Sequence, residues 1–268
     1  MHVLYCGDAG MCDGILLSVL SLCKHCDRPL HVYVLTAGIG EHRAIPAAFA
    51  SRLADVLREK HAQSTACVLD ITDRFLREPP TANMHTRFTP LCMLRLYADT
   101  LAELPDKLLY LDADVLACAD CGALWDTDIH GAEVAGVPDR YGKWFFGNIL
   151  RHDYLNSGVL LLNMARIREN GLFARCRALC REKKMFMPDQ SALNKLAVKQ
   201  KLPRRCNEQA MPHTDTVLKH FTTYFRFFPR FRAVTVKPWE TERVQNDLGI
   251  HRFDDIFAEF QRRTTHAN

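Results

Sequence analysis

Several features that would classify the protein at once are missing from the sequence. No run of about 18 apolar residues is present, so we expect no membrane-spanning helix. The N-terminal stretch MHVLYCGDAG has no basic segment followed by an apolar one, which predicts no signal peptide. The net charge is only +4, which argues against nucleic-acid binding over the whole surface. These absences predict a protein of the cytoplasm.

Glycine-rich phosphate-binding loops are missing as well. No GxxxxGKS or GxxxxGKT loop and no GxGxxG turn follows an expected strand. A phosphate-bearing ligand would therefore have to be held by a metal ion and by lysine or arginine side chains. The 268 residues also contain no internal repeat and no low-complexity linker, which favours a single main domain.

Cysteine, by contrast, is abundant, with an odd total of 11. Many cysteines lie inside apolar runs, as Cys6 does, which favours free thiols in a reducing compartment over a disulfide framework. Two CxxC pairs leave a zinc site as an alternative: Cys23 with Cys26, and Cys118 with Cys121. About 90 residues separate the pairs, whereas a compact zinc site has about 15 to 20 between them.

Apolar stretches alternate with amphipathic ones in the first half of the chain. The expected strands and helices follow one another at residues 2–6, 14–26, 30–38, 41–60, 66–71, 90–103 and 107–115, beginning with a strand. Strands that alternate with helices in this way predict βαβ units and a mainly parallel sheet.

The alternation is looser in the second half. Further strands are expected at residues 133–140 and 154–164, and helices at 165–184, broken near Gly171, and at 188–198. From about residue 206 the sequence is irregular and basic. We therefore expect an α/β domain over residues 1–205, with a mainly parallel mixed sheet flanked by helices. A C-terminal extension, residues 206–268, should pack on it.

Two carboxylates, Asp112 and Asp114, end the apolar run KLLYL. Burying a carboxylate is unfavourable unless it is paired or binds a metal. On a strand, residues i and i+2 point to the same face, so both side chains could bind one hard divalent cation. One aspartate could instead cap a turn while the other is solvated, but the position at a strand end favours the metal. Asp8 ends the first strand, and ligands gather at such ends.

Five motifs occur in order along the chain: YLDADVL, LWDTD, NSGVLLLNM, PDQSALN and KPW. From residue 1 to about 240 their order and approximate spacing resemble family 8 of the glycosyltransferases. That family includes bacterial lipopolysaccharide galactosyl- and glucosyltransferases and the glycogenins. The resemblance implies a GT-A fold and transfer of a hexose, with retention, from UDP-glucose or UDP-galactose. It also implies Mn²⁺, with Mg²⁺ as the alternative ion, and a role in cell-surface glycan or lipopolysaccharide-type synthesis.

The resemblance implies three metal ligands, Asp112, Asp114 and a histidine late in the chain. His220 is preferred for the third position because Phe221 after it preserves the His-aromatic pair of the family. His213, seven residues earlier, is the rival. An imidazole beside two carboxylates suits Mn²⁺ better than Mg²⁺, which prefers oxygen ligands and water.

The resemblance also assigns residues to the donor. Those assigned to the nucleotide and diphosphate are Cys6, Asp8, Ala113 and Lys237, although the segment between His220 and Lys237 is longer than in the family. Those assigned to the donor sugar and to catalysis are Arg95, Asp139, Asn156, Ser157, Asp189 and Gln190.

Simpler roles stay open for several of these residues. Arg95 could pair with Asp99 one helical turn away. Asp189 could cap the helix that follows it, Asn156 could be a turn residue, and Cys6 could only pack in its strand.

The segment 219–237 is basic and aromatic. Its simplest role is to pack the extension on the domain, with the cationic groups solvated. A second interpretation is peripheral contact with the inner face of a membrane, which would suit a lipid-linked acceptor. A nucleic-acid stacking surface is disfavoured. The acceptor itself, whether saccharide, lipid-linked or protein, and the oligomeric state leave no pattern in the sequence.

Retention could proceed by double displacement or by a front-face route. Double displacement needs a carboxylate nucleophile beside the anomeric carbon. The family places the amide of Gln190 there, so a front-face route is preferred. Two alternative functions use the same acidic site: a sugar-nucleotide transferase or phosphohydrolase, and a non-catalytic nucleotide-sugar-binding protein.

Overall fold

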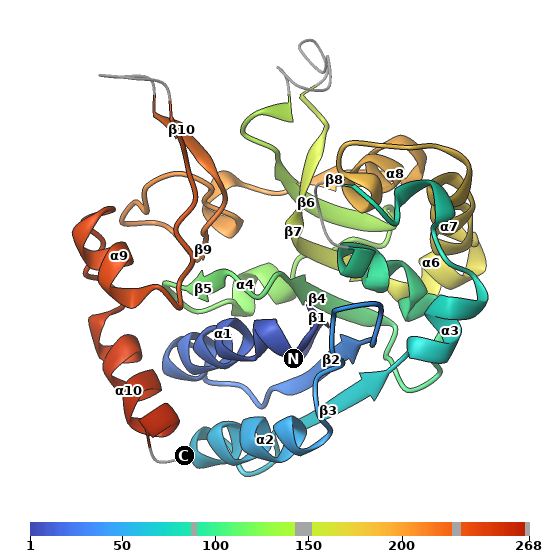
Figure 1. Ribbon diagram of the computed structural model, residues 1–268. Coiled ribbons are helices and arrows are strands. Elements are labelled where there is room, and N and C mark those ends of the chain that lie inside the picture. The colour runs from blue at the N-terminus through green and yellow to red at the C-terminus, as the bar shows by residue number, and fades with distance from the viewer. Residues whose placement is uncertain (87–89, 143–151, 227–231, 266–268) are drawn as a thin grey trace.

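A computed structural model describes residues 1–86, 90–142, 152–226 and 232–265. Its centre is a seven-stranded sheet in the order β3-β2-β1-β4-β7-β6-β8 (Figure 1). The strands of this sheet are β1 (His2–Gly7), β2 (His31–Thr36), β3 (Thr65–Asp70), β4 (Lys107–Leu111), β6 (Val134–Pro138), β7 (Leu155–Asn163) and β8 (Lys199–Lys201).

Strand direction changes in the second half of the sheet. β3, β2, β1 and β4 are parallel neighbours, as the βαβ pattern predicts. β7 runs antiparallel to β4 and to β6, and β8 is parallel to β6. The predicted mainly parallel mixed sheet flanked by helices is therefore confirmed.

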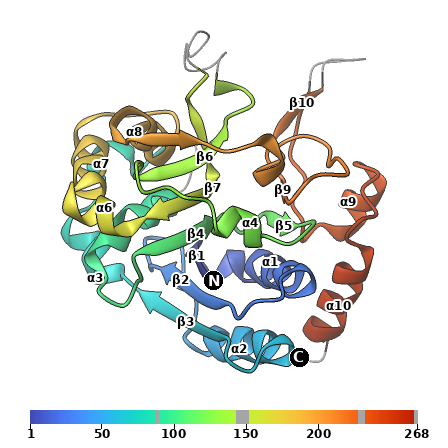
Figure 2. The ribbon, with the colours of Figure 1, turned by 180° about the vertical axis from the view of Figure 1, so that it is seen from behind.

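Helices cover both faces of the sheet, as Figures 1 and 2 show from opposite sides. The helices are α1 (Cys12–His25), α2 (Ala48–Lys60), α3 (Thr72–Arg77), α4 (Gly122–Trp125), α6 (Met164–Glu169), α7 (Leu172–Glu182), α8 (Pro188–Leu196), α9 (Thr241–Asn246) and α10 (Asp254–Thr265). Short 3₁₀ helices are η1 (Ala9–Met11), η2 (Thr81–Asn83), η3 (Pro90–Thr100) and η4 (Arg204–Cys206).

Two apolar cores result from the alternation of side chains along the strands. Val3 and Tyr5 of β1 belong to the core under α1, α2 and α10, whereas Leu4 belongs to the core under η3 and α7. All three residues are fully buried. Strands buried on both faces have continuous apolar sequences, which is why these runs could be recognised in the sequence.

Several expected element boundaries differ from the structure. The helix expected at 41–60 begins only at Ala48, after Pro46. The helix expected at 90–103 is the 3₁₀ helix η3, which ends at Thr100. The break predicted near Gly171 is confirmed: this residue has φ +62° between α6 and α7, a conformation that glycine adopts readily.

The C-terminal part is more regular than the sequence predicted. β5 (Val115–Ala117) pairs with β9 (Leu218–His220), and β10 (Tyr224–Arg226) pairs with β11 (Arg232–Val234). The expectation of an irregular segment after residue 206 is therefore wrong. The division of the chain at residues 205 and 206 stays a prediction.

α10 attaches the end of the described chain to the first helices (Figures 1 and 2). Phe257 and Phe260 join the core under α1, and Lys24 of α1 lies 2.5 Å from Asp255. The tip of the basic, aromatic segment, residues 227–231, lies outside the described residues, so its membrane contact stays a prediction. Within the described ranges, no helix is long and apolar enough to span a membrane.

Candidate functional site

The turn that joins β4 to β5 carries Asp112 and Asp114. The continuous strand expected over 107–115 is wrong, because β4 ends at Leu111 and Val115 N then donates to Asp112 O over 3.1 Å. The two carboxylates therefore approach each other through a turn, and not through the two-residue period of a strand.

His220 reaches the same place from the C-terminal part of the chain. The antiparallel pairing of β5 with β9 sets His220 opposite Val115. Its Nε2 lies 3.2 Å from Asp114 Oδ1 and 3.8 Å from Asp112 Oδ2. The rival histidine, His213, lies outside this group, and its side chain is 60% exposed. The structure thus brings together the three candidate ligands that the sequence favoured.

Asp112, Asp114 and His220 fit a metal ion. One ligand atom from each lies within 4.8 Å of the others. Asp114 Oδ1 is buried and has no hydrogen-bond donor, and leaving such an acceptor unpaired costs about 1–3 kcal/mol. A cation between these atoms would satisfy that oxygen, and two carboxylates with an imidazole suit Mn²⁺. In the described ranges, no other group of three or more histidine, cysteine or carboxylate side chains lies close enough together to hold a metal ion.

Lys237 adds a positive charge beside the three candidate ligands. Its Nζ lies 2.5 Å from Asp114 Oδ2. Burial alone would raise the pKa of Asp114, but Lys237 and His220 outweigh it and lower that pKa below its ordinary range. Burial also opposes the charged form of Lys237, yet Asp114 raises the pKa of this lysine. Both groups are therefore charged at neutral pH.

The long segment between His220 and Lys237 does not separate these two residues. β10 and β11 form a hairpin within it, and Thr223 and Thr235, which flank the hairpin, are joined by a hydrogen bond of 2.7 Å. The two ends of the inserted segment are therefore close together. Lys237 reaches Asp114 despite the insertion.

The KPW stretch packs against the start of α1. A Cβ added to Gly14 would lie 2.6 Å from Trp239 Cζ3 and 2.7 Å from Ala113 O. Only glycine allows α1 to approach both groups so closely. The backbone of Ala113, between the two aspartates, is thereby fixed against the first turn of α1.

Because Gly158 has no side chain, the His220 ring can pack directly against its backbone. A Cβ added to Gly158 would lie 2.1 Å from His220 Cε1, and 2.7 and 2.8 Å from the two ring nitrogens. The carbonyl of Gly158 also accepts a hydrogen bond of 2.8 Å from Asp112 N. One glycine of β7 therefore contacts two of the three candidate metal ligands.

We expect the substitution Gly158→Ala to displace the imidazole. Overpacking of this kind costs about 1–3 kcal/mol of unfolding free energy, and disturbing the surroundings of a ligand weakens metal binding by about 10–100-fold. Thermal unfolding and calorimetric titration with Mn²⁺ measure the two effects. Gly131→Ala is the control, because nothing lies within 4 Å of a Cβ there. Unchanged Mn²⁺ affinity in Gly158→Ala would show that the ring is not held by this contact.

Arg95 joins the candidate metal site to the residues assigned to the donor sugar. It is only 3% exposed, and its guanidinium lies 2.9 Å from Asp112 Oδ1 and 3.3 Å from Asp189 Oδ2. The alternative pairing with Asp99 does not occur, because Asp99 pairs with Arg177 over 2.6 Å. Arg95 thus lies between two carboxylates that come from different elements.

Other contacts hold the Arg95 guanidinium in position. It donates to Ser157 O over 2.5 Å and to Cys92 O over 3.1 Å, and it lies 3.9 Å from the centre of the Tyr110 ring. The Tyr110 hydroxyl donates to Asp112 over 2.6 Å. The orientation of Asp112 is therefore set by two neighbouring side chains.

Asp189 and Gln190 lie in the first turn of α8, where the buried start of the helix faces β7. Asp189 is not the N-cap, which is Met187, so helix capping does not explain it. Ser157 N donates to Gln190 Oε1 over 2.9 Å, and Ser157 Oγ lies 3.3 Å from Asp189 Oδ2. Burial raises the pKa of Asp189, and Arg95 opposes this rise.

Asp139, Asn156 and Gln190 form a cluster beside this turn. Asp139 Oδ2 accepts hydrogen bonds from Asn156 Nδ2 over 3.0 Å and from Gln190 Nε2 over 3.3 Å. Asn156 is the second residue of β7 and not a turn residue. The six residues assigned to the donor sugar are therefore connected to one another by hydrogen bonds or ion pairs.

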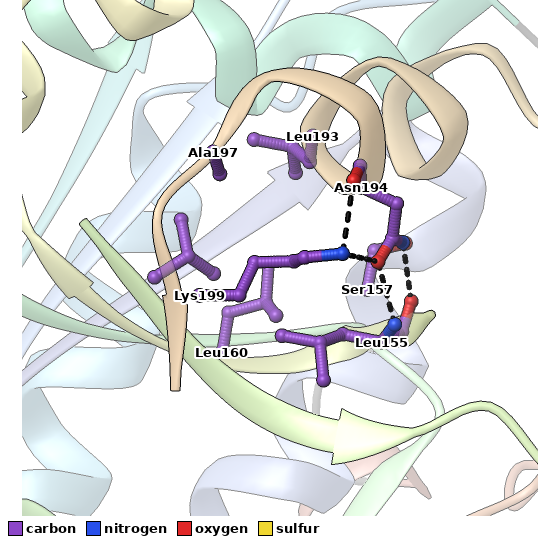
Figure 3. A pocket seen from close by; sticks show the side chains of 8 residues that line it. Leu155, Ser157, Leu160, Leu193, Asn194, Ala197 and Lys199 are labelled. Carbon is purple, nitrogen blue, oxygen red and sulfur yellow. Dashed lines mark hydrogen bonds between the residues drawn. The ribbon is translucent and has the colours of Figure 1, made fainter. Parts of the chain in front are cut away.

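Asn194 fastens α8 to the start of β7, as Figure 3 shows. Its side-chain amide accepts from Leu155 N over 2.6 Å and donates to Leu155 O over 2.7 Å. Lys199 donates to Asn194 O over 2.9 Å. The pocket between these residues has a volume of about 10 Å³, at the lower limit for one water molecule, and so is no sugar site.

The first strand contributes Cys6 and Asp8. Burial raises the pKa of the Cys6 thiol, which stays protonated near Arg95. Asp8 caps η1 by accepting from Gly10 N over 3.0 Å, and its other oxygen lies 2.6 Å from His42 Nδ1. Both residues lie at the carboxyl end of β1, next to β4 in the sheet.

Asn207 and His42 are among the residues in contact with the site that were missed in the sequence. Asn207 is fully buried and lies between Asn156 and His220, and His42 pairs with Asp8. Asn207 follows a 3₁₀ helix in a stretch without periodicity, so no pattern marked it. His42 lies in the segment that was expected to be helical.

The CxxC pairs do not form a metal centre in the described ranges. Cys26, Cys118 and Cys121 are buried free thiols, and Cys23 is half-buried. Among the residues described, only Asp112, Asp114 and His220 bring three candidate ligand atoms together.

Solved structures show the same fold. An active-site mutant of LgtC superposes with a TM-score of 0.72 at 21% identity, covering 97% of this chain and 96% of that chain. The galactosyltransferase LgtC in complex with donor and acceptor sugar analogues gives a TM-score of 0.70 at 22% identity, over 97% and 96% of the two chains. The GT-A fold expected from the sequence is therefore confirmed.

The curated sequence relatives are matched over only part of their own length. Probable galacturonosyltransferase-like 9 of Arabidopsis thaliana is 25% identical over 63% of this chain and 47% of its own length. Glycosyltransferase GlyA of Streptococcus pneumoniae is 27% identical over 70% of this chain and 24% of its own length. The chain therefore spans about half or less of the length of these curated relatives. The family model described as glycosyl transferase family 8 matches residues 2–206, and the chain belongs to that family.

Proposed function

We propose that the protein is a retaining hexosyltransferase that moves glucose or galactose from UDP to an acceptor hydroxyl in a Mn²⁺-dependent reaction. The observation that carries this proposal is the ion pairing of Arg95 with both Asp112 and Asp189. It joins a cluster suited to a metal and a diphosphate to a cluster suited to a sugar. A nucleotide diphospho-sugar is a ligand that needs both clusters, side by side, at one edge of a sheet.

The diphosphate would be bound by electrostatic attraction to a divalent cation and to the Lys237 ammonium. Asp112, Asp114 and His220 would hold a divalent ion, which would supply positive charge against the negative charge that develops on departing UDP. The charged ammonium of Lys237, next to Asp114, would contact the same phosphates. Asp8, Cys6 and the backbone of Ala113 would contact the nucleoside.

The sugar would lie over Asp139, Asn156, Asp189 and Gln190. A carboxylate nucleophile would suit double displacement, but Asp189 is 4% exposed and is paired with Arg95. We therefore favour a front-face route, in which the leaving phosphate oxygen takes the proton from the acceptor hydroxyl. In that route these residues bind and orient the sugar, and the anomeric configuration is retained.

The acceptor belongs to the same proposal. We propose a saccharide, lipid-linked or protein hydroxyl as acceptor, in cell-surface glycan or lipopolysaccharide-type synthesis at the cytoplasmic side. The segment 219–237 would supply peripheral contact with the inner face of the membrane. Nucleic acid is not proposed as a partner.

A screen of nucleotide sugars with Mn²⁺ tests the function. We expect UDP release from UDP-glucose or UDP-galactose when an acceptor is present, and a higher melting temperature with that donor. A ligand at 100 times its Kd stabilises the native state by about 2.7 kcal/mol. Release of pyrophosphate or of inorganic phosphate would instead indicate the transferase or hydrolase alternative. Binding of UDP-sugars without turnover by any acceptor would contradict an enzymatic role.

A further inference from the structure

Asn207 lies between the candidate metal site and the donor-sugar residues. It is 0% exposed, and its side chain touches one residue of each group. Its Nδ2 is 2.9 Å from Asn156 Oδ1, and its Oδ1 is 3.2 Å from His220 Nδ1. A buried amide with two such partners can contribute more than packing, because its oxygen can only accept hydrogen bonds and its NH₂ group can only donate them.

The orientation of Asn156 is fixed by groups that can act in only one way. Gly158 N, a backbone donor, lies 3.1 Å from Asn156 Oδ1. Asp139 Oδ2, a carboxylate oxygen that accepts, lies 3.0 Å from Asn156 Nδ2. Exchanging the oxygen and nitrogen of this amide would break both bonds.

That orientation determines the next amide and then the imidazole. Because Asn156 presents its oxygen, Asn207 must present its NH₂ group to it, which turns Asn207 Oδ1 toward His220. The ring atom facing this oxygen, Nδ1, must then carry a proton. In the neutral imidazole the lone pair is therefore on Nε2, the atom that faces Asp114 Oδ1 at 3.2 Å.

We propose that Asn207 is a positioning residue, which holds the His220 imidazole in the Nδ1-protonated form with Nε2 ready to bind a cation. Metal-ligating histidines commonly donate their second N–H to an oxygen that fixes the ring in this way. Here the oxygen belongs to a side chain that also bonds to Asn156, so the same residue links the metal ligand to the donor-sugar cluster. The inference rests on the proposed function, because it deepens the role of that metal site.

Two variants separate the two bonds of Asn207. Asn207→Ala removes both, and we expect Mn²⁺ affinity to fall by about 10–100-fold. Asn207→Asp keeps an acceptor for His220 Nδ1 but cannot donate to Asn156. We expect it to bind Mn²⁺ within about threefold of the wild type, since the oxygen toward the ring is retained, and to have a raised KM for the donor. Equal losses of Mn²⁺ affinity in both variants would overturn the inference.

A buried asparagine elsewhere provides the matched control. Asn83 is also 0% exposed, and its amide bonds to Cys180 O, Lys183 O and Met185 N at 2.6, 2.7 and 2.8 Å. Asn83→Ala therefore removes a comparable set of hydrogen bonds outside the candidate ligands. We expect it to lower the melting temperature without changing the affinity for Mn²⁺. A similar loss of affinity in both alanine variants would reduce Asn207 to a structural role and overturn the inference.

The tautomer can be measured without metal or donor. In the metal-free wild type, ¹⁵N correlation spectra should show the His220 proton on Nδ1, and in Asn207→Ala this preference should be lost. A proton on Nε2 in the neutral wild-type ring would overturn the inference. If the tautomer and Mn²⁺ binding are as expected but no nucleotide sugar is turned over, the proposed function fails while the positioning role of Asn207 stands.

Discussion

The substitution Asp114→Asn should lower the rate of sugar transfer by about 10³-fold, equivalent to about 4 kcal/mol of transition-state stabilisation. Asp114 is the carboxylate that contacts both His220 and Lys237, at 3.2 and 2.5 Å, and its buried Oδ1 has no other partner. An amide keeps the shape of the side chain but removes the charge that would bind the cation. The release of UDP with Mn²⁺ in the assay, compared between variant and wild type, measures the effect.

The control for this substitution is an exposed aspartate. Asp128 is 77% exposed at its side chain, and its Oδ1 accepts from His130 N, a bond that asparagine can keep. Asp128→Asn should therefore retain wild-type transfer. The melting temperature of Asp114→Asn should remain that of a folded protein, so that lost activity reports on the site. Transfer near the wild-type rate in Asp114→Asn would contradict the metal assignment.

The substitution Arg95→Met should be the most destabilising single change in the site, lowering the unfolding free energy by about 3–5 kcal/mol. Removing this guanidinium leaves Asp112 and Asp189 without their shared cation. Asp189 is 4% exposed, so water cannot replace the lost partner. Methionine preserves much of the apolar volume, which separates the electrostatic effect from a cavity. Denaturation in urea, monitored by circular dichroism, measures the loss.

An exposed arginine shows what burial contributes to this effect. Arg28 forms a bidentate pair with Asp126 at 2.8 and 2.6 Å, but the side chains are 44% and 56% exposed. Arg28→Met should therefore change the unfolding free energy by less than about 1 kcal/mol. If Arg95→Met were no more destabilising than Arg28→Met, the two buried carboxylates would have to be stabilised by other groups.

The strands of the sheet were predictable because their burial is continuous. The apolar runs at β1, β2 and β4 needed no tertiary information, and neither did the break at Gly171. The helix α10 was not recognised, although Ile256, Phe257 and Phe260 form a buried face. This helix lies after residue 206, in the part of the chain that was expected to be irregular, so no helix was predicted there.

The candidate site could be assembled from motifs, but its geometry could not. The sequence indicated Asp112 and Asp114 as neighbours, but His220 joins them only through the pairing of β5 with the distant β9. Asn207 could not be identified at all, because its role arises from partners 51 and 13 residues away along the chain. Contacts between distant segments leave no periodicity in the sequence.

The antiparallel pairing of β4 with β7 has a consequence for variants outside the site. It places the end of β4 beside the start of β7, where Gly158 O accepts from Asp112 N. The pairing register of two buried strands thus sets the separation between the candidate metal ligands and the residues assigned to the donor sugar. A slip of one residue would turn every β7 side chain to the opposite face. We therefore expect substitutions at buried positions such as Leu109 or Leu161 to change the spacing of the proposed donor site without contacting it.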